Sequence, residues 1–471
     1  MKKALVLGAA AMAALAIAPN PASAGEVKMG GYYMFRAQNT DKTVTKDAAN
    51  TDDQQYWQHR LQMKFDMIAS PKTHAHMVFR AFDNSLEGAD SGFVPAPDPD
   101  TTGMPAAGSA GSTISGIERS RFGTTERLWD IRQGWLETEA WTVGLKVGFM
   151  PISLNDRILV NDDTTGFATV MLSKSFGDIT VVGADVRVRE GNLGVGGNPA
   201  LNGTLNPGVS SYNTAVGSDE DDEDLYVLSL LGKASNINYQ VTGAYFNGGK
   251  GGFISNNINR AEDFWLAATA GGDFAGVNAT GTLIWEAGLD DGSPLLGNAT
   301  QVSQLKGGGG LGAVRLDGKT GFGGWEGYGF YSSKNFTNIT PRNQVWSATW
   351  DQGGPGGVKL MRTFATSTGV SNVSQNMWGV GAGLILNAQG WKINPMLDYA
   401  AVVKDQPMAG GAQAVYDDAW GGSLMLSTEI DKGTTLLLGG TAVKTGDGPG
   451  KTAASAADTM HTVQAAVKMA F

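Results

Sequence analysis

The sequence predicts an all-β protein, a transmembrane antiparallel up-and-down β-barrel of about 18 strands, within a range of roughly 16 to 20. Three observations predict this fold class: a secretory leader, segments in which apolar and polar residues alternate with period two, and connections that alternate between short turns and long polar loops. Period two is the repeat of a strand whose two faces meet different surroundings. An apolar face that recurs on strand after strand fits a barrel with lipid outside and water inside.

The amino-terminal segment is typical of a cleaved signal peptide. Lys2 and Lys3 precede an apolar run, residues 4–18, and the small residues 22–24 supply a cleavage site. We expect residues 1–24 to be removed and residues 25–471 to form a single transmembrane barrel with long extracellular loops. No later stretch offers the roughly 18 consecutive apolar residues that a spanning helix needs.

The composition excludes several kinds of site and argues against one class of partner. The chain has no Cys, which excludes disulfides, thiolate metal sites, covalent haem attachment and a lipoprotein anchor. Its formal net charge of −10 argues against nucleic acid as a partner. The 67 Gly and 18 Phe, spread along the chain, suit a closed sheet with one lipid face and one wet face.

The expected strands follow one another with the same alternation. In residues 56–69, one parity reads Trp57, His59, Leu61, Met63, Phe65 and Met67, and the other reads Gln58, Arg60, Gln62, Lys64 and Asp66. The pattern recurs in residues 27–38, 74–81, 182–189, 392–403 and 461–471. Weaker, Gly-rich candidates are residues 311–317, 327–333, 344–351 and 357–365, part of which could fold inward as a loop.

The connections indicate the orientation in the membrane. Short turns are expected at residues 69–73, 175–178, 233–236, 387–390 and 431–433, with long polar loops between them. This asymmetry is typical of bacterial outer-membrane barrels, whose short turns face the periplasm. Because both ends of the barrel-forming chain lie on the short-turn side, the strand count should be even.

Basic residues on the polar parity are the candidates for a pore wall. A charge facing hydrocarbon at mid-depth costs roughly 2–4 kcal/mol, so these residues should point inward. Arg36, Arg60 and Arg80 lie on successive strands and could form a basic ladder that favours anions. Alternatively, the arginines only pair with wet-face acids and stiffen the wall. The expected pore-lining basic residues are Arg36, Arg60, Lys64, Arg80, Arg132, Arg187 and Arg189.

Arg132 fits this set less well than the others. Its parity partners Asp130 and Gly134 suit a lumen, but Gln133 would then face outward between apolar neighbours. That misfit could mark a subunit contact.

Acidic residues cluster in or beside the expected loops. Asp156, Asp162 and Asp163, within residues 151–166, are candidates for the acidic side of a constriction. Asp219, Glu220, Asp221 and Asp222 belong to a run that is usually only solvated. Such a run could also bridge Ca²⁺ or Mg²⁺ to surface lipopolysaccharide, because carboxylates suit hard cations.

The histidines do not indicate an enzyme. His74 and His76 share the wet parity, but no motif places a nucleophile or carboxylate beside them. His59 and His461 share the apolar parity and suit the membrane interface. We expect no catalytic residues, no dedicated metal site and no cofactor.

The mature chain resembles a bacterial outer-membrane porin. Residues 132–137 (Arg-Gln-Gly-Trp-Leu-Glu) and 143–151 (Val-Gly-Leu-Lys-Val-Gly-Phe-Met-Pro) resemble a stretch of larger porins and alginate-export-like channels. The terminal aromatic, Phe471, resembles the assembly signal on the closing strand of such barrels. The resemblance implies a bacterial outer-membrane protein that contacts lipid and lipopolysaccharide, is inserted by the barrel assembly machinery, and forms a homo-oligomer, a trimer.

The expected function is passive diffusion of small hydrophilic solutes and ions through a water-filled lumen whose basic wall favours anions. One alternative is a substrate-selective channel for an organic acid, an inorganic anion or a saccharide. Another is a structural barrel, either a surface protein or the sheath of an electron-conduit assembly.

Overall fold

The computed structural model shows one closed, antiparallel sheet. It describes residues 25–41, 53–87, 129–189, 223–247, 262–287, 308–321, 323–333, 336, 377–402, 418–445 and 459–471. The predicted signal peptide and the predicted strands at 344–351 and 357–365 lie outside the described residues. The described part of the chain contains no helix with the length and hydropathy of a membrane span.

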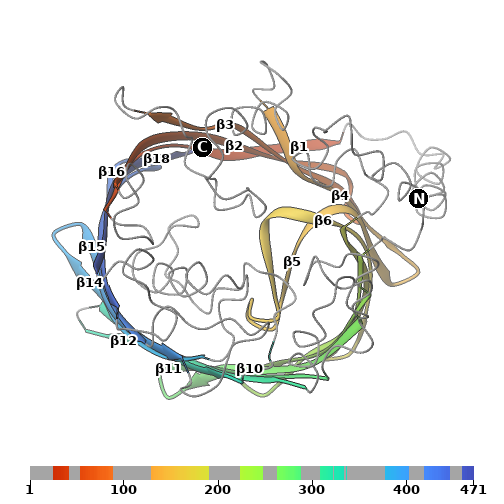
Figure 1. Cartoon of the computed structure of the whole chain (residues 1–471). Helices are drawn as coiled ribbons and strands as arrows, with labels where there is room; N and C mark the ends of the chain where they lie inside the picture. Colours follow the sequence, from red (N-terminus) through yellow and green to blue (C-terminus); the bar gives the residue numbers. More distant parts are fainter. Residues whose placement is uncertain are drawn as a thin grey trace, which may run out of the picture.

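The sheet has 18 strands, as predicted, and each strand pairs with its neighbours in the chain. Pairing of β1 with β18 closes the ring, which Figure 1 shows end-on. The strands are β1 (Glu26–Asp41), β2 (Asp53–Ser70), β3 (Thr73–Glu87), β4 (Trp129–Ala140), β5 (Val143–Leu154), β6 (Val160–Phe176), β7 (Ile179–Arg189), β8 (Glu223–Ala234), β9 (Ile237–Asn247), β10 (Glu262–Phe274), β11 (Val277–Glu286), β12 (Gly310–Thr320), β13 (Gly323–Ser332), β14 (Met377–Ala388), β15 (Trp391–Val402), β16 (Asp418–Asp431), β17 (Thr434–Thr445) and β18 (Thr459–Ala470).

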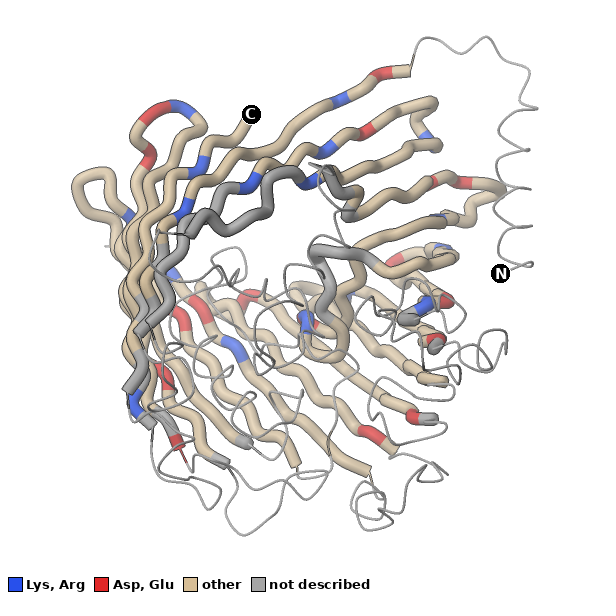
Figure 2. The backbone as a smooth tube through the Cα atoms, turned by 45° about the horizontal axis from the view of Figure 1, so that its top comes forward, with Lys and Arg blue, Asp and Glu red and all other residues tan. Residues whose placement is uncertain are grey.

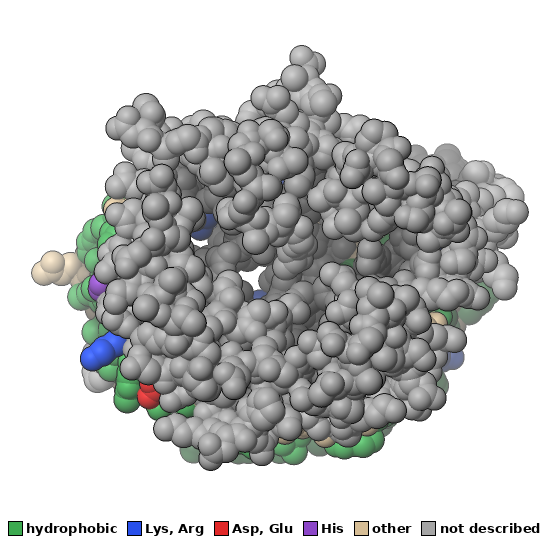
Figure 3. All heavy atoms as spheres, viewed as in Figure 1, with side chains coloured by type: hydrophobic (Ala, Val, Ile, Leu, Met, Phe, Trp, Pro, Cys, Tyr) green, Lys and Arg blue, Asp and Glu red, His purple; other side chains and the backbone are tan. Residues whose placement is uncertain are grey.

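Alternation along the strands separates the two faces of the wall. On β11, Thr282 and Ile284 are buried, whereas Leu283 and Trp285 between them are exposed. A row of exposed apolar side chains on one face is the lipid-facing surface expected of an outer-membrane barrel. Figure 3 shows hydrophobic side chains around the rim of the molecule where described residues are visible.

An aromatic belt lies on the outer face near the ends of the strands that lead into the long connections. Ring centroids of Tyr399 lie 5.2 Å from Trp378 and 4.5 Å from Trp420. Rings on this level recur from β8 to β16: Tyr226, Tyr245, Phe264, Trp285, Tyr331, Trp378, Tyr399 and Trp420. Such belts lie at the membrane–water interface, so this level marks one edge of the bilayer.

The carboxy-terminus forms the seam of the barrel. The backbone N–H of Gly31 donates to the carbonyl oxygen of Phe471 at 2.9 Å, and the N–H of Phe471 donates back to Gly31 at 3.1 Å. A Cβ at position 31 would lie 3.1 Å from the Phe471 ring and would collide with the carbonyl oxygen of Gln62. Only glycine fits where the terminal ring crosses β1.

The expected short turns are present. Ser70 pairs with Thr73, Phe176 with Ile179, and Ala234 with Ile237, so each connection is a tight turn. The strand ends at the opposite rim lead into the long connections, which lie outside the described residues. The weak candidates at 311–317 and 327–333 are strands β12 and β13.

The orientation in the membrane gives a first testable prediction. An epitope tag inserted at Gly217 or Asp219, in the long connection between β7 and β8, should be labelled on intact cells. A tag at Lys432, in the tight turn between β16 and β17, should be labelled only after the outer membrane is opened. If the Lys432 tag were labelled on intact cells and the Gly217 tag were not, the assigned orientation would be wrong.

Candidate pore and constriction

Strands β5 and β6 leave the wall and continue into the barrel as a hairpin, which Figure 1 shows crossing part of the interior. Their pairing shifts register between Met150 and Ile152, at Pro151, where the hairpin departs from the sheet. Proline cannot donate a ladder hydrogen bond and is tolerated at such an irregularity. The predicted constriction segment therefore folds inward.

The hairpin packs against one side of the wall in an apolar core. Ile158, Leu159 and Val160 have exposures of 1%, 0% and 1%. They share a cluster with inward-facing residues of the wall: Val186, Leu225, Val227, Ala244, Phe246, Trp265, Ala267, Ile284, Leu311, Ala313 and Phe330. The inner wall from β7 to β13 is thus covered by an apolar core that it shares with the hairpin.

The tip of the hairpin is fastened to this same side of the wall. The backbone N–H of Asn155 donates to Gln240 Oε1 on β9 at 3.2 Å, and Asn155 Nδ2 donates to Thr269 Oγ1 on β10 at 3.3 Å. Asp156 lies 3.4 Å from Arg315 of β12 in an ion pair. These contacts tie the tip to three strands.

The predicted basic ladder faces inward on β1, β2 and β3. Arg36, Arg60 and Arg80 are 6%, 3% and 4% exposed, so the ladder is covered within the barrel. In the sheet register, Arg36 on β1 lies opposite Gln58 on β2. Arg60 lies opposite Met34, which is the next inward-facing residue of β1 toward the short-turn rim, so Arg60 lies one inward-facing row below Arg36. Arg80 lies opposite Gln62, so the three guanidinium groups descend by one such row per strand.

Polar side chains continue this wall toward the seam. Arg80 donates to Gln62 Oε1 at 3.4 Å, and the Tyr32 hydroxyl donates to the same oxygen at 3.5 Å. Lys468 Nζ of β18 lies 4.2 Å from the centre of the Tyr32 ring. Lys64, on the same face of β2, is exposed. Together these residues form a basic wall from β18 to β3.

The two histidines of β3 belong to a network near the short-turn rim. His76 Nδ1 lies 2.6 Å from Asp66 Oδ1, and its Nε2 lies 3.8 Å from Glu137 Oε2. Lys146 Nζ contacts the same Glu137 oxygen at 2.9 Å, and the His76 ring stacks on Trp135 at 4.6 Å. The network links β2, β3, β4 and β5 and stiffens the wall.

An acidic patch lies on β13 and β15. The Tyr328 hydroxyl donates to Asp398 Oδ1 at 2.6 Å, and Asn394 Nδ2 donates to Glu326 Oε1 at 3.2 Å. Tyr328 reaches across β14 at Gly381, where a Cβ would collide with its ring. Glu326 and Asp398 thus form one acidic patch of the inner wall, and the acids Asp263 and Glu286 are buried on β10 and β11.

The placement of Arg187 differs from the prediction. On β7, Val186 is 1% exposed and pairs with buried Leu225, so the opposite parity, with Asp185 and Arg187, faces outward. Arg187 Nε donates to Asp224 Oδ1 at 2.8 Å near the end of these strands. The parity assignment fails because the hairpin makes this part of the interior apolar.

A β-bulge on β4 changes the faces of the sheet on which the residues around Arg132 were expected to lie. Val78 and Phe79 of β3 pair with Gln133 and Ile131, which leaves Arg132 as an extra residue. The bulge turns Gln133 inward, where it is 6% exposed, so the expected outward misfit and subunit contact at this residue are wrong. The side chains of Arg132 and Arg189 lie outside the described residues.

The expected acids of the constriction are only partly described. Asp156 lies at the hairpin tip but is paired with Arg315 rather than displayed alone. The side chains of Asp162 and Asp163, and all of residues 219–222, lie outside the described residues. Within the described ranges, no group of three or more His, Asp or Glu could hold a metal ion.

Several charged residues of the interior escaped the sequence reasoning, among them Asp263, Glu286, Arg315 and Glu326. Arg315 and Glu326 lie in a Gly-rich stretch where small residues blur the alternation, so only strand pairing reveals their inward direction. Arg157 follows Asp156 directly and could have been considered with it. Charged positions along the strands are separated by long uncharged stretches in Figure 2.

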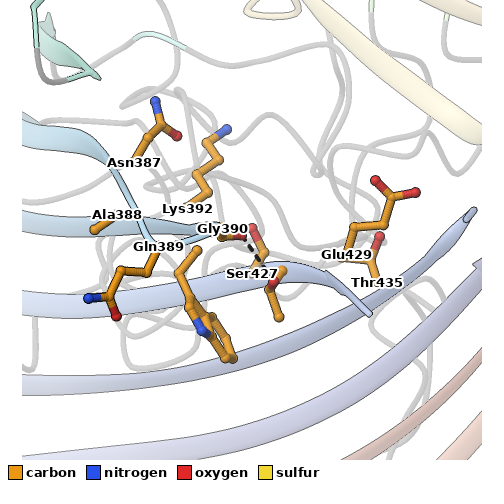
Figure 4. A pocket seen from close by; sticks show the side chains of 10 residues that line it. Asn387, Ala388, Gln389, Gly390, Lys392, Ser427, Glu429 and Thr435 are labelled. Atoms are coloured by element: carbon orange, nitrogen blue, oxygen red, sulfur yellow. Dashed lines mark hydrogen bonds between the residues drawn. The ribbon is translucent and has the colours of Figure 1, made fainter. Parts of the chain in front are cut away.

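The short-turn rim carries a shallow groove of about 380 Å³ formed by the ends of β14, β15, β16 and β17. Asn387, Lys392, Ser427 and Glu429 line it, and Thr428 Oγ1 donates to the carbonyl oxygen of Gly390 at 3.0 Å. Figure 4 shows these polar side chains at the strand ends. Trp391 and Ala388 also belong to the lining, so the groove is polar in part and apolar in part.

Comparison with solved structures identifies the architecture. Pseudomonas aeruginosa OccK9 (OpdG) matches with a TM-score of 0.52 and 11% identity, over 94% of this chain and 99% of that chain. A BenF-like porin from Pseudomonas fluorescens Pf-5 matches with a TM-score of 0.53 and 8% identity, over 95% and 99%. The chain has the fold of a bacterial outer-membrane porin. No family model and no curated protein matches it.

A third porin structure extends the comparison. Pseudomonas aeruginosa OpdK, solved with vanillate, matches with a TM-score of 0.51 and 8% identity, over 94% of this chain and 98% of that chain. The porin fold thus covers nearly the whole chain, from the first described strand to the seam. At these identities the likeness establishes the fold.

Proposed function

We propose that the protein is an outer-membrane porin that lets small hydrophilic solutes and ions diffuse through an off-centre aqueous channel. The supporting observation is the asymmetric interior of the closed barrel. The hairpin packs in an apolar core beside β7–β13, whereas basic groups face inward on β18–β3 and acids on β13 and β15. Charged groups placed inward in a closed barrel are expected around a lumen.

A substrate-selective channel is the second candidate. A hairpin anchored at its tip by β9, β10 and β12 restricts the lumen at a defined place, and such a restriction can select solutes by width and charge. The comparison protein OpdK was solved with vanillate, an aromatic carboxylate. We infer by analogy that small organic anions are the solutes to test first.

Solute permeation tests the proposal. Liposomes that contain the purified, folded protein should swell in isotonic solutions of small solutes, with rates that fall as solute size rises. Liposomes with unfolded protein provide the control. Folded, inserted protein that causes no swelling and carries no ions would favour a structural barrel or an assembly sheath instead.

The basic wall gives a prediction of selectivity. Replacing Arg36, Arg60 and Arg80 together by Gln should move the reversal potential in a salt gradient toward cations, because three fixed charges leave the wall. The Lys72→Gln variant, in an exposed turn, removes a charge away from the wall and serves as control. An unchanged reversal potential in the triple variant would place the ladder outside the permeation path.

We also propose the cellular context. The exposed apolar outer face and its aromatic belt suit a bacterial outer membrane with lipid and lipopolysaccharide as neighbours. Phe471 at the seam would be read by the barrel assembly machinery. A homotrimer, and Ca²⁺ or Mg²⁺ bridging by residues 219–222, remain predictions for native-mass and calcium-binding measurements. We assign the chain no catalytic activity.

A further inference from the structure

Four ionisable side chains on β2 to β5 form a network near the short-turn rim, which we call the rim network. Its members are Asp66, His76, Glu137 and Lys146. His76 is three residues from Thr73, at which β3 leaves its tight turn. At the rise of a β-strand the network therefore lies about 10 Å from this rim of the barrel.

The rim network faces the water of the lumen. Asp66 shares the parity of the inward-facing Arg60 and pairs with His76, and His76 pairs in turn with Trp135, which packs against the apolar core inside the barrel. The four side chains of the network are between 21% and 50% exposed, whereas the arginine ladder is 3–6% exposed. An inward side chain of a closed barrel is exposed only to the lumen or its mouth, so water reaches the network from there.

The contacts of His76 prepare its ring to take up a proton. Its Nδ1 lies 2.6 Å from Asp66 Oδ1, and an ionised carboxylate only accepts hydrogen bonds, so Nδ1 carries the proton of the neutral ring. The other nitrogen, Nε2, lies 3.8 Å from Glu137 Oε2. A proton taken up at Nε2 therefore meets a second carboxylate. The Trp135 ring, stacked at 4.6 Å, holds the plane of the imidazole and favours its cationic form.

Other charged and titratable groups surround the network. Lys146 Nζ, 2.9 Å from the same Glu137 oxygen, opposes a charge on His76. The remaining groups that face the network are Lys28, opposite Asp66 on β1, Lys64 of β2 and His74 of β3. Lys28 lies 3.7 Å from Glu26, and the ring of His74 is stacked 6.1 Å from that of His76. The two carboxylates and the ammonium of the rim network leave one net negative charge when His76 is neutral, and none when it is protonated.

The network lies in line with the arginine ladder. His76, Val78 and Arg80 are successive inward-facing residues of β3, so the network is two inward-facing rows from the lowest arginine of the ladder. An anion that follows the ladder toward the short-turn rim passes the rim network, and its charge acts on that anion. Histidine is the residue type whose charge changes between about pH 5 and pH 8.

We propose that His76 is a titratable specificity-determining residue of the channel: protonation at Nε2 cancels the net negative charge of the rim network, so the short-turn mouth favours anions more strongly as the pH falls. This inference rests on the proposed channel function. The sequence placed His74 and His76 on the wet parity without a carboxylate beside them, whereas strand pairing brings Asp66 and Glu137 to His76.

The test measures the reversal potential of purified barrels in planar bilayers under a KCl gradient, at pH 8 and at pH 5. The anion-to-cation permeability ratio of the wild type should rise by roughly twofold between the two, because one added charge beside the ion path acts on both ions in opposite senses. His76→Gln should keep the pH 8 ratio of the wild type and lose most of the rise. His76→Lys should hold the pH 5 ratio at both values.

Two further variants isolate the contribution of His76. His74→Gln removes the neighbouring imidazole and should retain the rise, and Asp66→Asn, which removes a negative charge from the network, should raise the ratio already at pH 8. Carboxylates elsewhere in the lumen titrate equally in all variants, so the difference from the wild type measures His76. Conducting barrels in which His76→Gln or His76→Lys keeps the full rise, or a wild type without any rise, would overturn this inference and leave the proposed channel intact. Folded wild-type barrels that pass no ions would overturn both.

Discussion

Replacing residues 152–165 by a two-residue Asn-Gly turn is expected to raise the single-channel conductance by about twofold or more, because the inserted hairpin fills one side of the lumen. The replacement keeps the pairing of Met150 with Phe167 in the wall and removes the inward extension beyond it. It also exposes inner-wall residues such as Leu225 and Trp265 to the lumen, so the barrel should melt at a lower temperature. The measurement is the current step of purified barrels in a planar bilayer.

A milder variant controls for misfolding of the shortened chain. Asn155→Ala removes the side-chain bond to Thr269, at a cost of about 0.5–1.5 kcal/mol, while the apolar core of the hairpin remains. Its current should fluctuate more than the wild-type current at a similar mean. If the shortened barrel folds and conducts like the wild type, the hairpin does not restrict the ion path.

Deleting Phe471 is expected to reduce the fraction of protein inserted in cells far more than it lowers the melting temperature of the barrels that do insert. The residue adds one exposed apolar contact at the seam, worth about 1.5–3 kcal/mol at most, and two backbone hydrogen bonds to Gly31. A ring of 18 paired strands should tolerate that loss once it has closed. Assembly, by contrast, requires the closing strand to be recognised and paired, since an open edge cannot persist in hydrocarbon.

The control is Phe471→Tyr, which keeps an aromatic terminus and both backbone bonds. It should insert like the wild type. Comparing inserted fractions by heat-modifiable gel mobility with the melting curves of purified barrels separates assembly from stability. Normal insertion of the Phe471 deletion would contradict an assembly role for the terminus.

The wall of the barrel could be predicted well where its two faces meet different solvents. On β18, the predicted outward parity includes Val463 and Met469, which are exposed, and the predicted inward parity includes Gln464, which is buried. The same holds for Arg36 and Arg60 on β1 and β2. In these strands apolar and polar residues alternate because one face contacts lipid and the other lies in polar surroundings.

The prediction failed where the interior is apolar. Ala184 and Val186 read as lipid-facing because they are hydrophobic, but both belong to the apolar core that the hairpin forms inside the barrel. Arg187 was then placed on the wrong face. Alternation alone cannot distinguish a lipid contact from a core contact, so the side of β7 is decided only by the register with β8.

The candidate site was only partly predictable for a related reason. The constriction segment was located, but the pairing of Asp156 with Arg315 joins residues 159 positions apart and depends on the path of the hairpin across the lumen. The bulge that turns Gln133 inward depends on the pairing of β3 with β4. Such contacts arise from strand pairing and hairpin direction, which single-strand patterns do not contain.

The most direct test of the channel is the current through the purified wild-type protein in a planar bilayer, recorded in symmetric salt and then in a salt gradient. A channel with the basic wall of β18–β3 predicts discrete ohmic current steps and a reversal potential displaced toward the equilibrium potential of the anion. Folded barrels that insert without conducting, or that conduct with a clear cation preference, would contradict the proposed channel with a basic wall.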